Sequence, residues 1–386
     1  MPGTNYDVIV IGVGSMGVSS CYFLATRGYK VLGIEQFELP HDQGAHAGQS
    51  RIIRKAYFEH PDYVPLLKKA YENWQQLEEQ TGEQVYFKTG LLYQGPADHV
   101  MIKGVKEAAL LYGIELEQLT IQKSLSVFPR FVVSGSSEVI YEPDAGFIRP
   151  EKIISLYKNE AEKKGAAIHT KEIVLEWKKE KGGITVITDR DTYHSEKLII
   201  TAGAWSGKML PQLASKLTVT RQVIVWVKTR DTKPFEMPGF PCWLIADNKR
   251  GGALYGFPFL RKDQFGEPEG IKFAWHYPGD KTKPEKVNRQ IDKSEIDTLI
   301  RDVAAYIPAL SGAAPVAAKT CLYTNSPDEN FIIDYLPGYE RDVVIACGFS
   351  GHGFKFVSVA GEILADLAIK GESDLPVDFL SLGRFQ

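Results

Sequence analysis

Residues 6–17 of the chain have the sequence YDVIVIGVGSMG. The β-branched run at residues 8–11 predicts a strand that is buried on both faces. Residues 15–27 predict a helix, and residues 30–34 predict a second strand that leads to Glu35. The order strand, helix, strand is typical of the unit that opens a parallel sheet.

The glycines of this stretch predict a dinucleotide site. Gly12, Gly14 and Gly17 fit the spacing G-x-G-x-x-G: the first permits a tight turn, the second lets the backbone approach a pyrophosphate, and the third lets helix and strand pack closely. The start of the helix presents free N–H groups and a positive dipole to the phosphates. Glu35 lies 23 residues after Gly12 and is placed to accept the ribose hydroxyls, which favours FAD or NAD over NADP.

Composition narrows the class of protein. A length of 386 residues with 44% apolar residues predicts two closely joined domains. A net charge of −3 gives no basic field, which argues against nucleic acid as a partner. No apolar run approaches the ~20 residues of a membrane helix, and the first strand begins too early to leave room for a signal peptide. We therefore expect a cytoplasmic protein.

The cysteines and histidines do not form a metal-binding pattern. The four cysteines include no C-x-x-C pair, and the eight histidines are scattered, so we expect no metal site. Sparse cysteines suit a reducing cytosol. We expect Cys21 and Cys347 to be small buried residues.

Later segments predict a second, different sheet. Short strand-like runs between residues 218 and 315 are separated by Pro, Gly and charged turns, which predicts a mostly antiparallel sheet that supports a substrate. Residues 85–93 predict one strand, whereas a strand at 343–346 and a helix at 356–370 return to α/β character. We expect a nucleotide domain made of residues 1–85, 150–217 and 319–386, and a substrate domain made of residues 86–149 and 218–318.

Two glycine-rich turns are candidates for contact with a ligand. The segment TAGAW at residues 201–205 follows an apolar strand, and its small residues let backbone approach a ligand. The turn CGFSGHGFK at residues 347–355 precedes the last helix and can bring several N–H groups against a flavin or phosphate. Lys355 starts that helix, where a cation is unfavourable unless an anion compensates it; a surface lysine is the alternative.

Several polar side chains stand in apolar surroundings. Arg51 and Arg54 share a face on a helix and point to opposite sides on a strand. Their apolar neighbours suggest burial, so each needs an anion, either a substrate carboxylate or an internal salt bridge. Lys272 and His276 face the same way on a strand and could share a cavity, or could lie on an ordinary solvent face. Cys321 is predicted to be a buried thiol.

Taken together, these segments resemble the monomeric sarcosine oxidase family, which includes N-methyl-L-tryptophan oxidase. The resemblance covers essentially the full chain. Its specific pieces are VIVIGVGSMG at residue 8, PHDQGAHAGQSRIIR ending at Arg54, TAGAW at 201, YGFP at 255, CLYTNSPDENFIID at 321 and GFSGHGFKF at 348.

The resemblance implies a two-domain α/β fold with a Rossmann-like FAD-binding domain and an antiparallel substrate domain, similar to glutathione reductase and D-amino-acid oxidase. It implies FAD bound covalently through a thioether to Cys321, and a substrate carboxylate held by Arg54 and Lys355. It implies that Lys272 promotes the reaction with oxygen. It places Arg51 and His46 near the flavin ring, with His276, Tyr255 and Tyr323 lining the substrate cavity.

The predicted cofactor-binding set combines these positions with the glycine-rich turns: Gly12, Gly14, Ser15, Met16, Gly17, Glu35, Gln36, His46, Ser50, Arg51, Gly203, Trp205, Cys321, Gly348, Gly351, His352, Gly353 and Lys355. The predicted catalytic set is Lys272, Arg51, His276 and Tyr255.

The implied reaction is oxidative demethylation of an N-methyl amino acid, sarcosine or N-methyl-L-tryptophan, by O2 and water in a monomeric enzyme. Pipecolate, glycine or a glycated amino acid are alternative substrates, and a flavin dehydrogenase with another acceptor is an alternative class. Two departures bear on substrate identity. The family often has two adjacent histidines where this chain has His46 and Ala47, and the loop at residues 259–270 is longer, so we expect it to reshape the mouth of the pocket.

Overall fold

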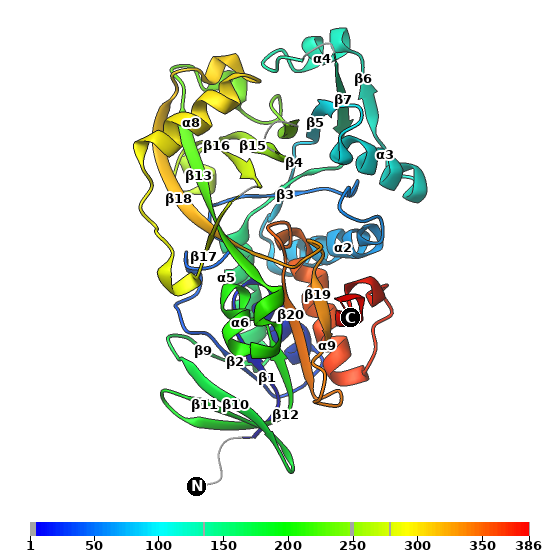
Figure 1. Ribbon diagram of the computed structural model, residues 1–386, viewed down its shortest axis with the longest axis vertical. Helices are drawn as coiled ribbons and strands as arrows, with labels where there is room; N and C mark the ends of the chain where they lie inside the picture. The colour runs from blue at the N-terminus through cyan, green and yellow to red at the C-terminus, as the bar shows by residue number, and fades with distance from the viewer. Residues whose placement is uncertain (1–4, 134–135, 248–250, 278, 386) are drawn as a thin grey trace.

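The computed structural model describes residues 5–133, 136–247, 251–277 and 279–385. Two large sheets and one small sheet organise these residues. The sheet that contains the N-terminal strand lies in the lower half of Figure 1, and the second large sheet lies in the upper half.

The first sheet is built around the predicted strand–helix–strand unit. Its strands follow the order β10-β11-β12-β1-β2-β9, and β20 joins it through β12 and β19 through β20. Pairing of β1 with β2 and β12, of β2 with β9, and of β12 with β20 is parallel. The bounds are β1 (Asn5–Ile11), β2 (Val31–Ile34), β9 (Ala167–His169), β10 (Val174–Glu180), β11 (Gly183–Thr188), β12 (Thr192–Ile200), β19 (Ile332–Tyr335) and β20 (Val343–Cys347).

Three helices share a core with one face of this sheet. They are α1 (Ser15–Thr26), α5 (Pro150–Lys163) and α9 (Val357–Lys370), and α2 (Tyr63–Thr81) packs beside α9. Val18, Cys21 and Leu24 of α1 are fully buried. A Cβ at Gly17 would lie 2.2 Å from the carbonyl oxygen of Gly12, so only glycine allows α1 to start this close to the β1 turn.

The second sheet is mostly antiparallel, as expected. Its order is β17-β13-β16-β15-β14-β5-β7-β6, and β18 pairs with β13; the β14–β5 pair is parallel. Fully buried Trp243 and Phe273 belong to its core, and α8 (Lys293–Ala304) contributes to the same core. The bounds are β5 (Leu91–Pro96), β6 (Glu117–Leu119), β7 (Ser137–Glu142), β13 (Thr218–Lys228), β14 (Cys242–Asp247), β15 (Gly252–Leu260), β16 (Gly270–His276), β17 (Asp280–Thr282) and β18 (Ala314–Asn325).

A third, three-stranded sheet has the order β3-β8-β4 and corrects one prediction. Residues 85–93 do not form one strand: β4 (Tyr86–Lys88) belongs to this sheet, and β5 begins only at Leu91. Gly90 separates them with φ +68°, a left-handed conformation that ends a strand. The remaining elements are β3 (Arg51–Ile53), β8 (Gly146–Ile148), α3 (Val100–Tyr112), α4 (Ile121–Val127), α6 (Ser206–Met209) and α7 (Lys262–Phe265).

The expected division into a nucleotide and a substrate domain stays a prediction. Strand β18 crosses the expected boundary between residues 318 and 319, because it pairs with β13 on both sides of that point. Within the residues described, no helix combines the length and the apolar character needed to cross a membrane.

Candidate active site

A long cavity opens where the parallel strands of the first sheet end, which is where open α/β sheets bind ligands. It is bordered by the β1–α1 turn, by the end of β2, by the TAGAW turn and by the glycine-rich turn before α9. Of the residues predicted to bind the cofactor, those that line this cavity are Gly12, Gly14, Ser15, Met16, Glu35, Gln36, His46, Arg51, Gly203, Trp205, Gly348, Gly351 and Gly353. The other residues predicted to bind the cofactor do not border it: Gly17, Ser50, Cys321, His352 and Lys355. The last three line a second cavity.

The phosphate and ribose end of this cavity fits a dinucleotide. A Cβ at Gly14 would meet no atom within 4 Å, so open space lies against the backbone there. The first turn of α1 has no side-chain cap, which leaves N–H groups for an anion. Glu35 is 5% exposed at the end of β2, and burial raises the pKa of its carboxyl to about 7. Such a buried acid is satisfied by hydroxyl donors.

The part of the cavity beside His46 contains a buried polar atom that has no hydrogen-bond partner. His46 is 3% exposed, and its Nε2 has no hydrogen-bond partner. Burial lowers the pKa of His46 to about 3, so the ring is neutral. A buried nitrogen without a partner is costly, and a ligand in the cavity that His46 borders would supply one.

A second cavity adjoins the first. Both are lined by Arg51, Tyr323, Gly351 and Phe354. The second cavity also brings together, from segments far apart in the sequence, four more of the predicted substrate and catalytic residues: Arg54, Tyr255, His276 and Lys355. Cys321 and His352, predicted to contact the cofactor, line it as well. Lys272 does not border it, although it lies on the same strand as His276.

Arg54 has an internal partner that sequence reasoning missed. Its Nη2 lies 2.7 Å from both carboxylate oxygens of Glu59, and its Nη1 donates to the carbonyl of Ala56 at 2.8 Å. Arg54 is 3% exposed. Although burial acts to raise it, the charge of Arg54 lowers the pKa of Glu59 to about 2. The salt bridge considered as an alternative for Arg54 is therefore present, and Glu59 borders the cavity as well.

Lys355 provides a second buried cation beside this pair. It lies in a short 3-10 turn, Phe354–Phe356, that leads into α9, and its Nζ donates to the carbonyl of His352 at 2.8 Å. Burial and the charge of Arg54 lower the pKa of Lys355 to about 7. It is 6% exposed, so it is not the surface lysine of the alternative reading.

Lys272 is fully buried. Its Nζ donates to the carbonyls of Gly48, at 2.7 Å, and Ser50, and lies 4.0 Å from the centre of the Phe257 ring. The Ser50 carbonyl also accepts from Nη1 of Arg51 at 2.9 Å. Burial and the charge of Arg51 lower the pKa of Lys272 well below its ordinary value. One carbonyl thus links Lys272 to a residue that borders both cavities.

Cys321 lines the second cavity beside Arg51, which borders both cavities. It is 4% exposed, and its Sγ lies 3.8 Å from Nη2 of Arg51. In the same wall, the Tyr323 hydroxyl lies 3.2 Å from Nδ1 of His276. Burial lowers the pKa of His276 to about 3 and raises that of Tyr255 to about 12, so both side chains are neutral. Cys21 and Cys347 are buried, as expected.

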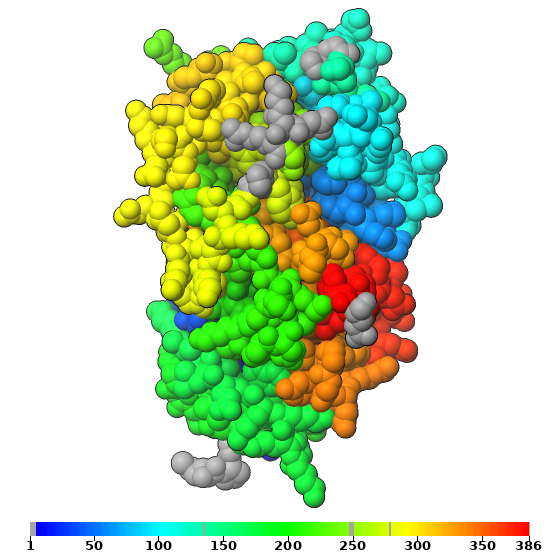
Figure 2. Space-filling view, in the orientation of Figure 1, coloured from blue at the N-terminus to red at the C-terminus, as the bar shows by residue number. Residues whose placement is uncertain are grey.

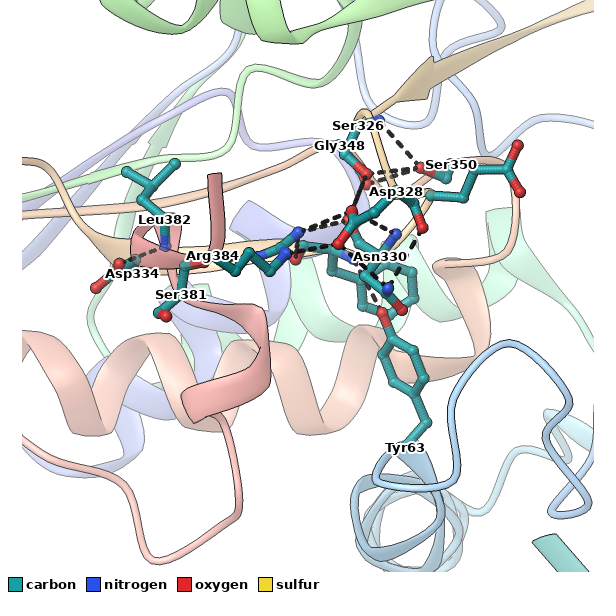
Figure 3. A network of polar contacts seen from close by, with 12 residues as sticks. Tyr63, Ser326, Asp328, Asn330, Asp334, Gly348, Ser350, Ser381, Leu382 and Arg384 are labelled. Atoms are coloured by element: carbon teal, nitrogen blue, oxygen red, sulfur yellow. Dashed lines mark hydrogen bonds and ion pairs between the residues drawn. The ribbon is translucent and has the colours of Figure 1, made fainter. Parts of the chain in front are cut away.

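The C-terminal residues support this wall, which the sequence did not reveal. Figure 2 shows them packed at the surface beside the segment near residue 330. Arg384 pairs with Asp328 at 2.8 Å and donates to the carbonyls of Asn330 and Phe331 (Figure 3). Glu329 lies between Asp328 and Asn330 in the chain, and its carbonyl accepts from Nε2 of His352 at 2.9 Å.

Comparison with known proteins decides the family. The FAD dependent oxidoreductase family matches residues 7–367. A monomeric sarcosine oxidase from Streptomyces avermitilis is 37% identical over 97% of this chain and 96% of its own length. The chain belongs to the FAD-dependent oxidoreductase family. An N-methyl-L-tryptophan oxidase from Salmonella dublin is 33% identical over 99% of both chains.

Solved structures agree on the fold of this FAD-dependent oxidoreductase. An amino acid oxidase of nikkomycin biosynthesis has a TM-score of 0.84 at 23% identity, covering 98% of this chain and 97% of that one. A glycine oxidase from Geobacillus kaustophilus has a TM-score of 0.78 at 18% identity, covering 98% of each. The family also selects FAD from the two cofactors that the Glu35 argument left open.

Proposed function

We propose that the protein is an oxidase that converts an N-methyl amino acid, O2 and water into the primary amino acid, formaldehyde and hydrogen peroxide. The observation that carries the proposal is the pair of buried cations, Arg54 and Lys355, in a cavity that shares walls with the dinucleotide cavity. The relatives named sarcosine oxidase and N-methyl-L-tryptophan oxidase act on substrates of this class by their names. Bound FAD supplies the chemistry: it takes two electrons from the substrate and passes them to O2.

The substrate carboxylate binds between Arg54 and Lys355. Glu59 occupies one side of the Arg54 guanidinium, so the carboxylate uses the remaining N–H groups or displaces Glu59. Fixing the carboxylate orients the N-methyl group toward the neighbouring cavity, which is an entropic contribution to rate.

The cavity also selects the neutral amine. Arg51, Arg54 and Lys355 border it together with one carboxylate, Glu59. The cations outnumber the carboxylate, so an ammonium there loses its proton more readily. His276 and Tyr255 are neutral at their lowered and raised pKa values of about 3 and about 12. They therefore line the cavity with hydrogen-bonding groups that add no charge.

We further propose that the flavin is attached through Cys321 and that Lys272 promotes the reaction with oxygen. The place of Cys321 in the second cavity, beside the Arg51 that borders both cavities, supports the first role. The link from Lys272 through the Ser50 carbonyl to Arg51 supports the second. Burial and Arg51 lower the pKa of Lys272, whereas the two carbonyls that accept from its Nζ favour the protonated amine, and a protonated amine stabilises a developing anion. We propose, too, a cytoplasmic monomer.

The attachment has a direct test. Wild-type protein precipitated with acid is expected to keep its yellow colour in the pellet, whereas Cys321→Ser protein is expected to release flavin to the supernatant. Flavin that washes out of both proteins would remove Cys321 from this role.

The substrate class is tested by mixing the FAD-loaded enzyme anaerobically with a panel of amines and following the flavin absorbance band. Sarcosine or N-methyl-L-tryptophan is expected to bleach the band, and air is expected to restore it with formation of peroxide. Bleaching by pipecolate, glycine or a glycated amino acid alone would overturn demethylation. Bleaching without peroxide in air would indicate a dehydrogenase.

A further inference from the structure

The long loop at residues 259–270 does not border the substrate cavity, which corrects the expectation that it reshapes the mouth of the pocket. It joins the end of β15 to the start of β16, at the opposite end of this hairpin from Tyr255 and His276. Instead it contacts Gln49, whose Nε2 donates to the carbonyls of Gly266 and Pro268, both at 3.0 Å.

Gln49 sits in a turn that is tied down on several sides. Its Oε1 accepts from Nε1 of Trp226 at 3.0 Å. Its φ is +69° and that of the preceding Gly48 is +121°, both in the left-handed range that most residues avoid. A turn of this conformation persists only where surrounding contacts hold it.

Glu151 supplies those contacts for the backbone itself. This residue lies in the first turn of α5, where the helix dipole favours a carboxylate. Its Oε1 accepts from the N–H of Gly48 at 2.7 Å, and both carboxylate oxygens accept from the N–H of Gln49 at 3.1 Å. Although burial acts to raise it, these N–H groups lower the pKa of Glu151.

The two sides of this turn have opposite tasks. Its N–H groups point to Glu151, whereas the carbonyls of Gly48 and Ser50 accept from Nζ of Lys272. Arg51 also donates to the Ser50 carbonyl. The amides that hold Glu151 and the carbonyls that hold the lysine thus belong to one short stretch of backbone, so a displacement on one side moves the other.

We propose that Glu151, together with Gln49, is the positioning device that holds Lys272 in place, and that it thereby sets the rate at which the reduced enzyme reacts with oxygen. The inference rests on the oxygen role of Lys272 in the proposed function. In that reaction O2 takes two electrons and two protons from the reduced flavin and leaves as hydrogen peroxide. Glu151 and Gln49 do not touch the reacting atoms; they act through the Gly48–Ser50 turn.

The test uses FAD-loaded enzyme reduced with one equivalent of dithionite and mixed with air-saturated buffer, so it needs no substrate. Glu151→Gln keeps an acceptor oxygen but loses the charge, and we expect reoxidation to slow about 10-fold. Gln49→Asn tolerates the left-handed conformation but is too short to make the same contacts, and it is expected to slow reoxidation in the same direction. Flavin reduction by an active substrate is expected to change less than about 3-fold in both variants, because Arg54 and Lys355 are untouched.

Glu160→Gln is the matched control, since Glu160 is also on α5 and 7% exposed but pairs with Lys163 instead. Wild-type reoxidation in both Glu151→Gln and Gln49→Asn, or equal slowing in Glu160→Gln, would overturn the inference. Lys272→Met distinguishes a failure of the positioning role from a failure of the oxygen role of Lys272. If it reoxidises slowly while both turn variants do not, only the positioning role fails; if it reoxidises at the wild-type rate, the proposed oxygen role of Lys272 fails first.

Discussion

Lys355 and Lys272 are both buried lysines that donate to backbone carbonyls, yet their surroundings differ. Lys355 borders the second cavity, and one of its N–H groups donates to the carbonyl of His352. Lys272 is 0% exposed, donates to two carbonyls, lies against the Phe257 ring and does not border that cavity. A lysine with N–H groups facing a cavity can bind a ligand, whereas one enclosed by carbonyls is held in a fixed position.

Arg54→Ala is expected to have the largest effect, and it tests the carboxylate site in the second cavity. It leaves Glu59, which is 12% exposed, beside the cavity without its partner, which is expected to cost about 3 kcal/mol of the free energy of unfolding. Binding of a carboxylate inhibitor such as acetate, followed by flavin absorbance, is expected to weaken about 30-fold, as for a lost charged hydrogen bond of about 2 kcal/mol.

The double variant Arg54→Ala/Glu59→Ala is the control for Arg54→Ala. It is expected to recover much of the stability, measured by denaturant unfolding, and none of the inhibitor binding. Unchanged acetate affinity in Arg54→Ala would return Arg54 to a purely structural salt bridge.

Lys272→Met tests the role of the enclosed lysine in the reaction with oxygen. Methionine fills a similar space without the charge, so the loss is electrostatic rather than steric. Reoxidation by O2 is expected to slow about 10-fold to about 100-fold, and anaerobic reduction by substrate is expected to stay within about 3-fold of wild type. Stopped-flow measurement of each half-reaction separates these outcomes; equal slowing of both would contradict the assignment.

The pH dependence of acetate binding tests whether Lys355 contributes its charge to the second cavity. Because the pKa of Lys355 is about 7, this cation is present below pH 7 and lost above it. Acetate, ionised above about pH 5, is therefore expected to bind about 10-fold more weakly as pH rises through this range. His352 and His276, with pKa values of about 4 and about 3, are neutral throughout and add nothing to the change.

Lys355→Arg provides the control, because a guanidinium stays charged across this range. Its acetate affinity is expected to be flat between about pH 6 and about pH 9. A wild-type pH profile that persists in Lys355→Arg would assign the titration to another group.

The smallest effect is expected for Arg384→Gln. This change removes the ion pair with Asp328 and loosens the loop whose Glu329 carbonyl holds His352. Because the pair is partly exposed, we expect a loss of stability of about 1 kcal/mol and a few-fold weaker acetate binding. Reoxidation is expected to be unchanged. A slower reoxidation would show that the surroundings of Lys355 and those of Lys272 are coupled.

Local pattern was enough for the elements whose signals lie within a few residues. The β1–α1–β2 unit, with Gly12, Gly14 and Glu35 at its cavity, follows from short-range spacing and from alternation of apolar residues. The break between β4 and β5 was not predicted, because a single glycine such as Gly90 does not by itself indicate that a strand ends. Only the pairing of the two strands with different sheets shows it.

Short-range signals were therefore enough to predict the β1–α1–β2 unit, the family and the kinds of residue at the site. The partners of those residues are visible only in the folded chain: Glu59 for Arg54, and the Gly48 and Ser50 carbonyls for Lys272. Glu59 lies only five residues after Arg54, but in an irregular segment where no periodicity specifies which side chains meet. For Lys272 the physical reason is distance along the chain. Lys272 and Gly48 are 224 residues apart, and no local periodicity specifies which carbonyl a buried cation meets once two sheets have folded against each other.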